Sequence, residues 1–213
     1  SEILDKKWDH KEIAFNKDMI SILAKEKPPT YFEPSEKWEY CNTGYALLAS
    51  IIEKVTGLTF KDFMQKNIFT PLQMKHTRVY NTRRSGEILA NYAYGYVYSD
   101  SLERYILPDS LPDYNYVYFL DGIQGDGIIN STTGDLLKWD RFLYENNLGF
   151  DTLVRKLMHP HVLCDSAKVA SYERYNGTSK LHYGYGVFIG KNEFGDFIYH
   201  GGQWPGYKTE IFH

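Results

Sequence analysis

The chain has 213 residues, of which 43% are hydrophobic and 24% are charged. This composition is typical of a globular protein and argues against long disordered segments. The formal net charge of -3 argues against a nucleic acid partner, and the longest apolar run, YALLASII, is too short to form a transmembrane segment.

A chain of this length can form one large domain or two small ones. Its two cysteines, Cys41 and Cys164, lie far apart and lack metal-ligand spacing, which leaves a disulfide between them open. His159 and His161 could form a metal pair, but the intervening proline and the lack of a carboxylate partner favour a surface loop. These spacings predict no metal site, and we also expect no organic cofactor.

The first predicted helix covers residues 17–26. Met19, Ile22 and Leu23 recur at helical spacing, and Asn16 before them is the expected N-cap. Prolines within residues 28–34 then force extended or turn backbone.

Residues 43–56 carry the strongest helical pattern. Apolar side chains cover most of this helix, so we expect it to be largely buried. They are Tyr45, Ala46, Leu47, Leu48, Ala49, Ile51, Ile52 and Val55. Gly57 is the expected stop, and Thr59 with Asp62 resembles a capping box that opens a short helix through Asn67.

The middle of the chain is rich in tyrosine and glycine, and we expect short strands at residues 92–98 and 103–107. A second capped helix follows from Thr132–Asp135 onwards. Its apolar residues are Leu136, Leu137, Trp139, Phe142 and Leu143.

In the last third of the chain, the spacing of apolar residues changes from helical to alternating. Residues 182–190 alternate as in one strand, with Tyr183, Tyr185, Val187 and Ile189 on one face. Residues 196–202 and 207–213 are predicted to be further strands. Helices first and an antiparallel meander last predict an α+β fold.

The motif Tyr40-Cys41-Asn42 stands where the chain enters the helix at residue 43. A phenol can relay protons if nearby cations lower its pKa, and a carboxamide offers both a donor and an acceptor to a substrate amide. The alternative is that Asn42 caps the helix and Tyr40 only packs.

The second motif is His200-Gly201-Gly202 in a predicted strand. The glycines would let a ligand approach the backbone, and the imidazole could donate or shuttle a proton. The alternative is a glycine-rich hairpin turn with an incidental histidine.

Three segments of this chain resemble segments of the serine β-lactamase-related family and follow one another in the family's order. The family includes class C β-lactamases, DD-peptidases, D-aminopeptidases and esterases. The three segments are residues 32–77 around Tyr40-Cys41-Asn42, GDGIINSTTGDLLKW at 125–139 and HGGQWPGY at 200–207. The resemblance implies a β-lactamase/transpeptidase-like fold and acyl transfer through a serine ester.

The resemblance also implies a role for each residue. Tyr40 would move protons at the nucleophilic serine, and Asn42 would hold the substrate amide or the motif lysine. His200 would take the position where class C β-lactamases carry lysine and many peptidases and esterases carry histidine. Gly201 and Gly202 would leave room for the acyl group, and the backbone N–H of Gln203 would form part of the oxyanion hole.

The family's nucleophile motif, Ser-x-x-Lys, does not occur in these 213 residues. We therefore expect a fragment of a single domain, mainly helical at about 11–150 and with antiparallel strands at about 180–213. The chain itself should be inactive, whereas the intact parent would hydrolyse amides or esters of a small-molecule or peptide substrate.

The main alternative is a non-catalytic relative that binds peptidoglycan or another glycan, for which the 19 tyrosines are suited. Exposed sheet edges would favour a homo-oligomer or a distorted C-terminal third. By resemblance, the compartment would be extracytoplasmic, either periplasmic or secreted.

Overall fold

The computed structural model describes residues 2–145, 151–164 and 181–213. It divides into two compact units, each described by itself. Unit 1 consists of Ser1–Pro29, Cys41–Lys138 and Gln203–Tyr207, and unit 2 of Thr30–Tyr40, Trp139–Gly202 and Lys208–His213. The boundaries cut through a helix and a β-hairpin, so the units share secondary structure.

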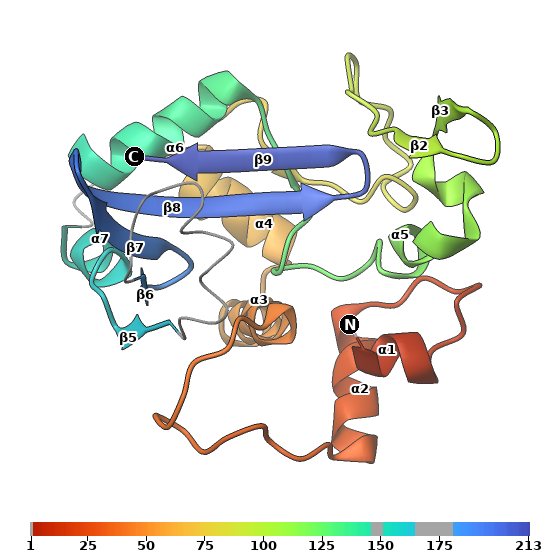
Figure 1. The fold of residues 1–213 in the computed structure, drawn as a ribbon, viewed down its shortest axis with the longest axis horizontal. Coiled ribbons are helices and arrows are strands. Elements are labelled where there is room, and N and C mark those ends of the chain that lie inside the picture. The colour runs from red at the N-terminus through yellow and green to blue at the C-terminus, as the bar shows by residue number, and fades with distance from the viewer. Residues whose placement is uncertain (1, 146–150, 165–180) are drawn as a thin grey trace. The chain divides into compact units, whose positions relative to one another are not determined.

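Unit 1 holds most of the helices (Figure 1). They are α1 (Glu2–Lys7), α2 (Asn16–Glu26), α3 (Asn42–Thr56), α4 (Phe60–Met64), a π-helix (Gln65–Phe69), two 3-10 turns (Pro108–Ser110 and Pro112–Tyr114) and α5 (Tyr116–Phe119). Its core comprises Leu4, Ala14, Met19, Ala46, Phe119 and Ile123. This core joins the N-terminal helices to α3 and to the segment after α5.

Two antiparallel strand pairs complete unit 1. β1 (Arg78–Val79) pairs with β4 (Ile129–Asn130), and β2 (Val97–Ser99) pairs with β3 (Arg104–Ile106). The predicted strand at 92–98 is therefore mostly wrong, since only its last residues pair. The other predicted strand, at 103–107, is confirmed.

Helix α2 is confirmed, but its N-cap is Phe15 and not Asn16. The Asp18 carboxylate accepts a hydrogen bond from the Phe15 N–H at 2.9 Å. Asn16 is used elsewhere: its amide donates to the carbonyls of Ala46 and Gln124, both at 2.9 Å. The Asn16 side chain thus makes long-range hydrogen bonds and does not cap its own helix.

Helix α3 is also confirmed, and Gly57 ends it with φ 71°. The expectation that this helix is largely buried is wrong. Only Ala46 and Ala49 are buried, whereas Leu48, Ile51 and Val55 are 52%, 54% and 79% exposed. An apolar pattern shows which face of a helix could be buried, not that another segment packs on it. In the described residues no segment covers the face of Leu48, Ile51 and Val55.

Two capped helix starts are confirmed. The Thr59 hydroxyl accepts from the Asp62 N–H at 3.0 Å, and α4 then continues into the π-helix beyond Asn67. Helix α6 (Thr133–Glu145) starts after Thr132, whose hydroxyl accepts from the Asp135 N–H at 3.3 Å.

Unit 2 is built on a five-stranded antiparallel sheet in the order β5-β6-β7-β8-β9 (Figure 1). The strands are β5 (Val162–Leu163), β6 (His182–Tyr183), β7 (Phe188–Asn192), β8 (Gly195–Trp204) and β9 (Tyr207–Phe212), and α7 (Asp151–Leu157) precedes them. The expected antiparallel meander is confirmed in these described strands.

The prediction of one strand at 182–190 is wrong. The chain reverses between Tyr183 and Phe188, which become cross-strand partners of β6 and β7. The Gly184 N–H donates to the Val187 carbonyl at 2.8 Å and closes this turn. Alternation alone cannot reveal a reversal, because the residues on both arms of a hairpin also alternate.

Candidate active site

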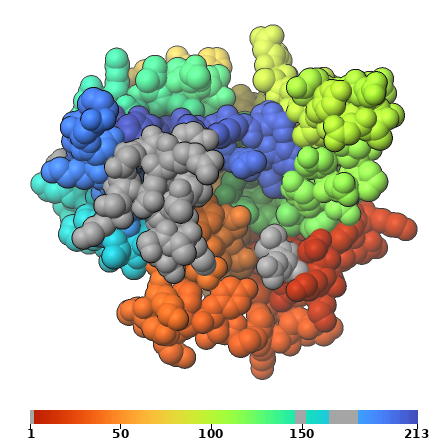
Figure 2. Space-filling model, in the orientation of Figure 1, coloured from red at the N-terminus to blue at the C-terminus, as the bar shows by residue number. Residues whose placement is uncertain are grey.

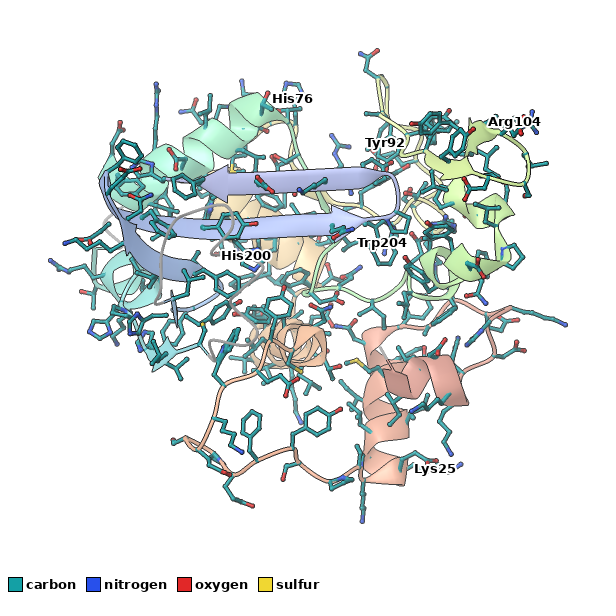
Figure 3. The ribbon with its side chains drawn as sticks, in the orientation of Figure 1. Lys25, His76, Tyr92, Arg104, His200 and Trp204 are labelled. Carbon is teal, nitrogen blue, oxygen red and sulfur yellow. The ribbon has the colours of Figure 1, made fainter. Side chains whose placement is uncertain are left out.

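Tyr40 and His200 lie next to each other in unit 2. Their ring centroids are 6.0 Å apart, with an interplanar angle of 39°. His200 comes from the middle of β8 (Figure 3), and Tyr40 from the segment that leads into α3. Two residues far apart in sequence thus meet within the roughly 10 Å of one small-ligand site.

A buried aromatic pair lies behind these two rings. Tyr183 packs edge-on against Tyr40 at 6.3 Å, and Phe188 stacks on His200 at 6.0 Å. Tyr183 and Phe188 contact each other at 4.9 Å, and Trp38 packs against both. Tyr40 itself is 43% exposed, which keeps part of its ring accessible.

Burial lowers the pKa of His200, while a hydrogen bond with the Gly201 backbone opposes that shift. Burial therefore favours the neutral form of the imidazole. A neutral imidazole has one nitrogen that donates and one that accepts, which suits it to transfer a proton.

The two glycines after His200 have close neighbours within the sheet. A Cβ at Gly201 would lie 2.7 Å from the Tyr199 hydroxyl, and one at Gly202 would lie 2.6 Å from the Thr209 hydroxyl. A side chain at either position would thus need the neighbouring hydroxyl to move. Their expected role beside an acyl group stays a prediction.

The remaining predicted site residues, Asn42 and Gln203, belong to unit 1. Asn42 is exposed and is the first residue of α3, but it does not cap the helix. Cys41 does so, because its sulfur accepts from the Gly44 N–H at 3.4 Å. The alternative in which Asn42 is the cap is therefore wrong.

Gln203 lies in the β8–β9 hairpin, directly before Trp204 (Figure 3). The Trp204 ring packs edge-on against Tyr116 at 5.5 Å. Gly206 lies against the backbone of Gly95, so close that a Cβ would be 2.3 Å from the Gly95 carbonyl carbon. These contacts hold the turn that carries Gln203.

Sequence reasoning missed Trp38, Tyr183 and Phe188 as neighbours of the site. The misplaced strand at 182–190 put Tyr183 and Phe188 on opposite faces, whereas the hairpin makes them direct partners. The glycines at 184 and 186 were the available signal for a turn.

Neither a metal-ligand cluster nor a disulfide is present among the described residues. They contain no group of three or more His, Cys, Asp or Glu side chains that could hold a metal ion. Both cysteines are free thiols, Cys41 exposed and Cys164 buried, and burial raises the pKa of Cys164 to about 11. The disulfide that the sequence left open is not formed.

No helix within residues 2–145, 151–164 and 181–213 is long and apolar enough to span a bilayer.

Comparisons with known proteins agree on one family. The family model described as Beta-lactamase matches residues 4–213. Penicillin-binding protein 4* of Bacillus subtilis is 43% identical over 205 residues, covering 95% of this chain and 42% of that protein. A D-aminopeptidase of Brucella ovis is 25% identical over 199 residues, covering 93% of this chain and 33% of that protein.

The fold is matched by a solved structure of a penicillin-binding protein from Bacillus halodurans. It has a TM-score of 0.75 and 25% identity, and the match covers 99% of this chain and 58% of that one. The chain spans less than half the length of the two relatives. The α+β, β-lactamase/transpeptidase-like fold is confirmed, and the chain belongs to the beta-lactamase family, a family of serine hydrolases.

Proposed function

We propose that these residues form part of the active site of a serine hydrolase that cleaves amide or ester bonds through an acyl-enzyme. The observation that carries the proposal is the contact between Tyr40 and His200 at 6.0 Å. A phenol and a neutral imidazole side by side can pass a proton to and from a reacting oxygen or nitrogen.

In this proposal Tyr40 and His200 move the protons, and Asn42 binds the substrate amide or the motif lysine. The N–H of Gln203 donates to the oxyanion, with Gly201 and Gly202 beside the acyl group. The nucleophile would be a serine in a Ser-x-x-Lys motif, which these 213 residues lack. The chain alone should therefore be inactive, because loss of a nucleophile removes several orders of magnitude of rate.

The relatives support a peptide or amide substrate. One is by name a penicillin-binding protein and the other a D-aminopeptidase. With histidine at position 200, we propose a peptidase or esterase before a true β-lactamase.

The test compares two proteins: the 213-residue chain and the product of the complete reading frame that contains it. Each is treated with fluorescent penicillin and with a fluorophosphonate probe. We expect covalent labelling of a serine in the complete product and none in the 213-residue chain. Labelling of the 213-residue chain would contradict its proposed inactivity.

Two substitutions in the complete product test the site. Tyr40→Phe and His200→Ala should each slow labelling about 100-fold, the lower range for loss of a general acid–base group. Tyr31→Phe and His159→Ala are matched controls at exposed positions and should leave the rate unchanged. Equal labelling rates in all four variants would contradict the proposed proton-transfer roles of Tyr40 and His200.

A non-catalytic glycan-binding relative is the second candidate. It is favoured by exposed tyrosines near β2 and β3, where Tyr94, Tyr96, Tyr98 and Tyr105 are each at least half exposed. Residues of the β2–β3 hairpin lie at the surface that Figure 2 shows. A complete reading frame without Ser-x-x-Lys, together with retention on peptidoglycan, would favour this candidate over the enzyme.

We also propose that the protein acts outside the cytoplasm and associates through an edge of its sheet. In the described residues β9 is the last strand and pairs with β8 alone, and such an edge can pair with another chain. Light scattering of a dilute sample would test the association, and a clean monomer would contradict it.

A further inference from the structure

We infer that Tyr183 and Phe188 are positioning residues that fix the Tyr40 phenol and the His200 imidazole relative to each other. The catalytic value of that geometry rests on the proposed function. The geometry itself can be measured without any reaction.

The first step is an unbroken chain of ring contacts. Tyr40 meets Tyr183 at 6.3 Å and 88°, Tyr183 meets Phe188 at 4.9 Å and 76°, and Phe188 meets His200 at 6.0 Å and 29°. The chain closes on itself, because Tyr40 and His200 also meet at 6.0 Å. Each of the four aromatic side chains thus contacts two of the other three.

The second step is the rigidity of the inner pair. Tyr183 and Phe188 are only 6% and 3% exposed, and they face each other across the β6–β7 pairing. Backbone register and close packing therefore restrict the rotamers of both side chains. Edge-on and stacked aromatic contacts then favour particular orientations of the outer rings.

The third step is the freedom that the outer pair would otherwise have. Tyr40 is 43% exposed and precedes α3, outside any helix or strand. Holding a half-exposed side chain in one place costs conformational entropy, which the contact with Tyr183 helps to offset. Phe188 also contributes to the burial that lowers the pKa of His200.

The experiment is an NMR titration of the 213-residue chain. Nuclear Overhauser contacts between the Tyr40 and His200 rings report their approach, and the His200 imidazole shifts report its pKa. Phe188→Leu keeps an apolar side chain but removes the ring. We expect loss of the Tyr40–His200 contact and a rise in the pKa of His200 towards its ordinary value.

The matched control is Phe197→Leu. Phe197 lies in the same sheet, is 4% exposed and stacks on Phe212 at 5.1 Å. This variant should lose similar stability but keep the Tyr40–His200 contact and the His200 titration. Phe188→Tyr, which keeps the ring, should behave like the unsubstituted chain.

Tyr183→Leu tests the same contacts from the other end, so the proposal stays testable if one variant does not fold. It should also abolish the Tyr40–His200 contact, while Tyr183→Phe should preserve it. The inference is overturned if Phe188→Leu and Tyr183→Leu change the two NMR signals no more than Phe197→Leu does.

Kinetics then separate this inference from the proposed function. In the complete product, Phe188→Leu should slow labelling by fluorescent penicillin about 10- to 100-fold, as expected for a misplacement near 1 Å. If the NMR signals change but Tyr40→Phe leaves labelling unaffected, the proposed function fails and the positioning role stands.

Discussion

Helices α3 and α6 carry similar apolar patterns, yet they differ in how much of the pattern is buried. In α6, Phe142 and Leu143 are 7% and 3% exposed. In α3, Ile51 and Val55 are 54% and 79% exposed. The comparison teaches that an apolar face marks where a helix can be covered, while the rest of the chain decides whether it is.

The buried side of α3 is narrow and closely packed. Ala46 and Ala49 face the loop at Gly125, whose φ of 104° places its backbone against them. Asn16 also donates to the Ala46 carbonyl on this helix. One face of α3 is thus held at short range and another is open, so substitutions on the two faces should differ sharply.

The largest effect is expected at Gly125. In Gly125→Ala the new Cβ would lie 2.6 Å from both the Ala49 Cβ and the Tyr45 carbonyl, in a backbone conformation that disfavours a side chain. We expect a loss of about 3 kcal/mol in the free energy of unfolding, from strain and overpacking together. Urea denaturation measures it. Gly127→Ala is the control, since nothing lies within 4 Å of its Cβ.

The second largest loss in the free energy of unfolding is expected at the buried face of α6. Leu143→Ala removes a side chain that is 3% exposed, and we expect it to cost about 2 kcal/mol, the lower end of the usual range for such substitutions. Leu137→Ala, on the same helix but 62% exposed, should cost well under half as much. Equal thermal midpoints for the two variants would show that α6 is no better covered than α3.

The start of α6 should make stability depend on pH. Burial acts to raise the pKa of Asp135, but hydrogen bonds from Lys138, the His76 N–H and the Thr77 hydroxyl prevail and lower it. A lowered folded-state pKa stabilises the fold above the unfolded value of about 3.9. That stabilisation is lost as the pH falls through the folded-state pKa.

Asp135→Asn should therefore cost about 1–3 kcal/mol at pH 7, as for hydrogen bonds to a charged group. The difference from the unsubstituted chain should shrink at pH 3, which urea midpoints at both pH values would show. Asp113→Asn, at an exposed position, serves as the control. A difference that stayed constant between pH 7 and pH 3 would rule out the charged form as its source.

The smallest effect is expected on the open face of α3. Ile51→Ser should change the free energy of unfolding by less than about 0.5 kcal/mol, the usual range for surface substitutions. Ala49→Leu on the buried face should cost about 1–3 kcal/mol through overpacking. A large loss from Ile51→Ser in the 213-residue chain would mean that this face is covered in solution.

Much of the fold could be predicted from local signals. The glycine after α3 and the threonine–aspartate starts of α4 and α6 set helix ends through bonds made within a few residues. The wrong predictions arise where local signals are not enough. The role of Asn16 and the exposure of α3 depend on partners that are distant in sequence. The reversal between β6 and β7 depends on a turn that leaves the alternation of side chains intact.

The candidate site divides in the same way. Tyr40, Asn42 and His200 could be chosen from the sequence because their motifs stand in the order typical of the family. Their roles remain predictions. The sequence could not show that Tyr183 and Phe188 connect Tyr40 to His200, because that contact needs the turn between β6 and β7.

By itself, the sequence determined the end of α3, the starts of α4 and α6, the α+β order of elements and the residue types able to move protons. These follow from bonds between near neighbours and from side-chain chemistry. Tertiary structure alone decided which apolar faces are buried and brought the phenol and the imidazole together. Both depend on packing between segments that are distant along the chain, which local patterns do not encode.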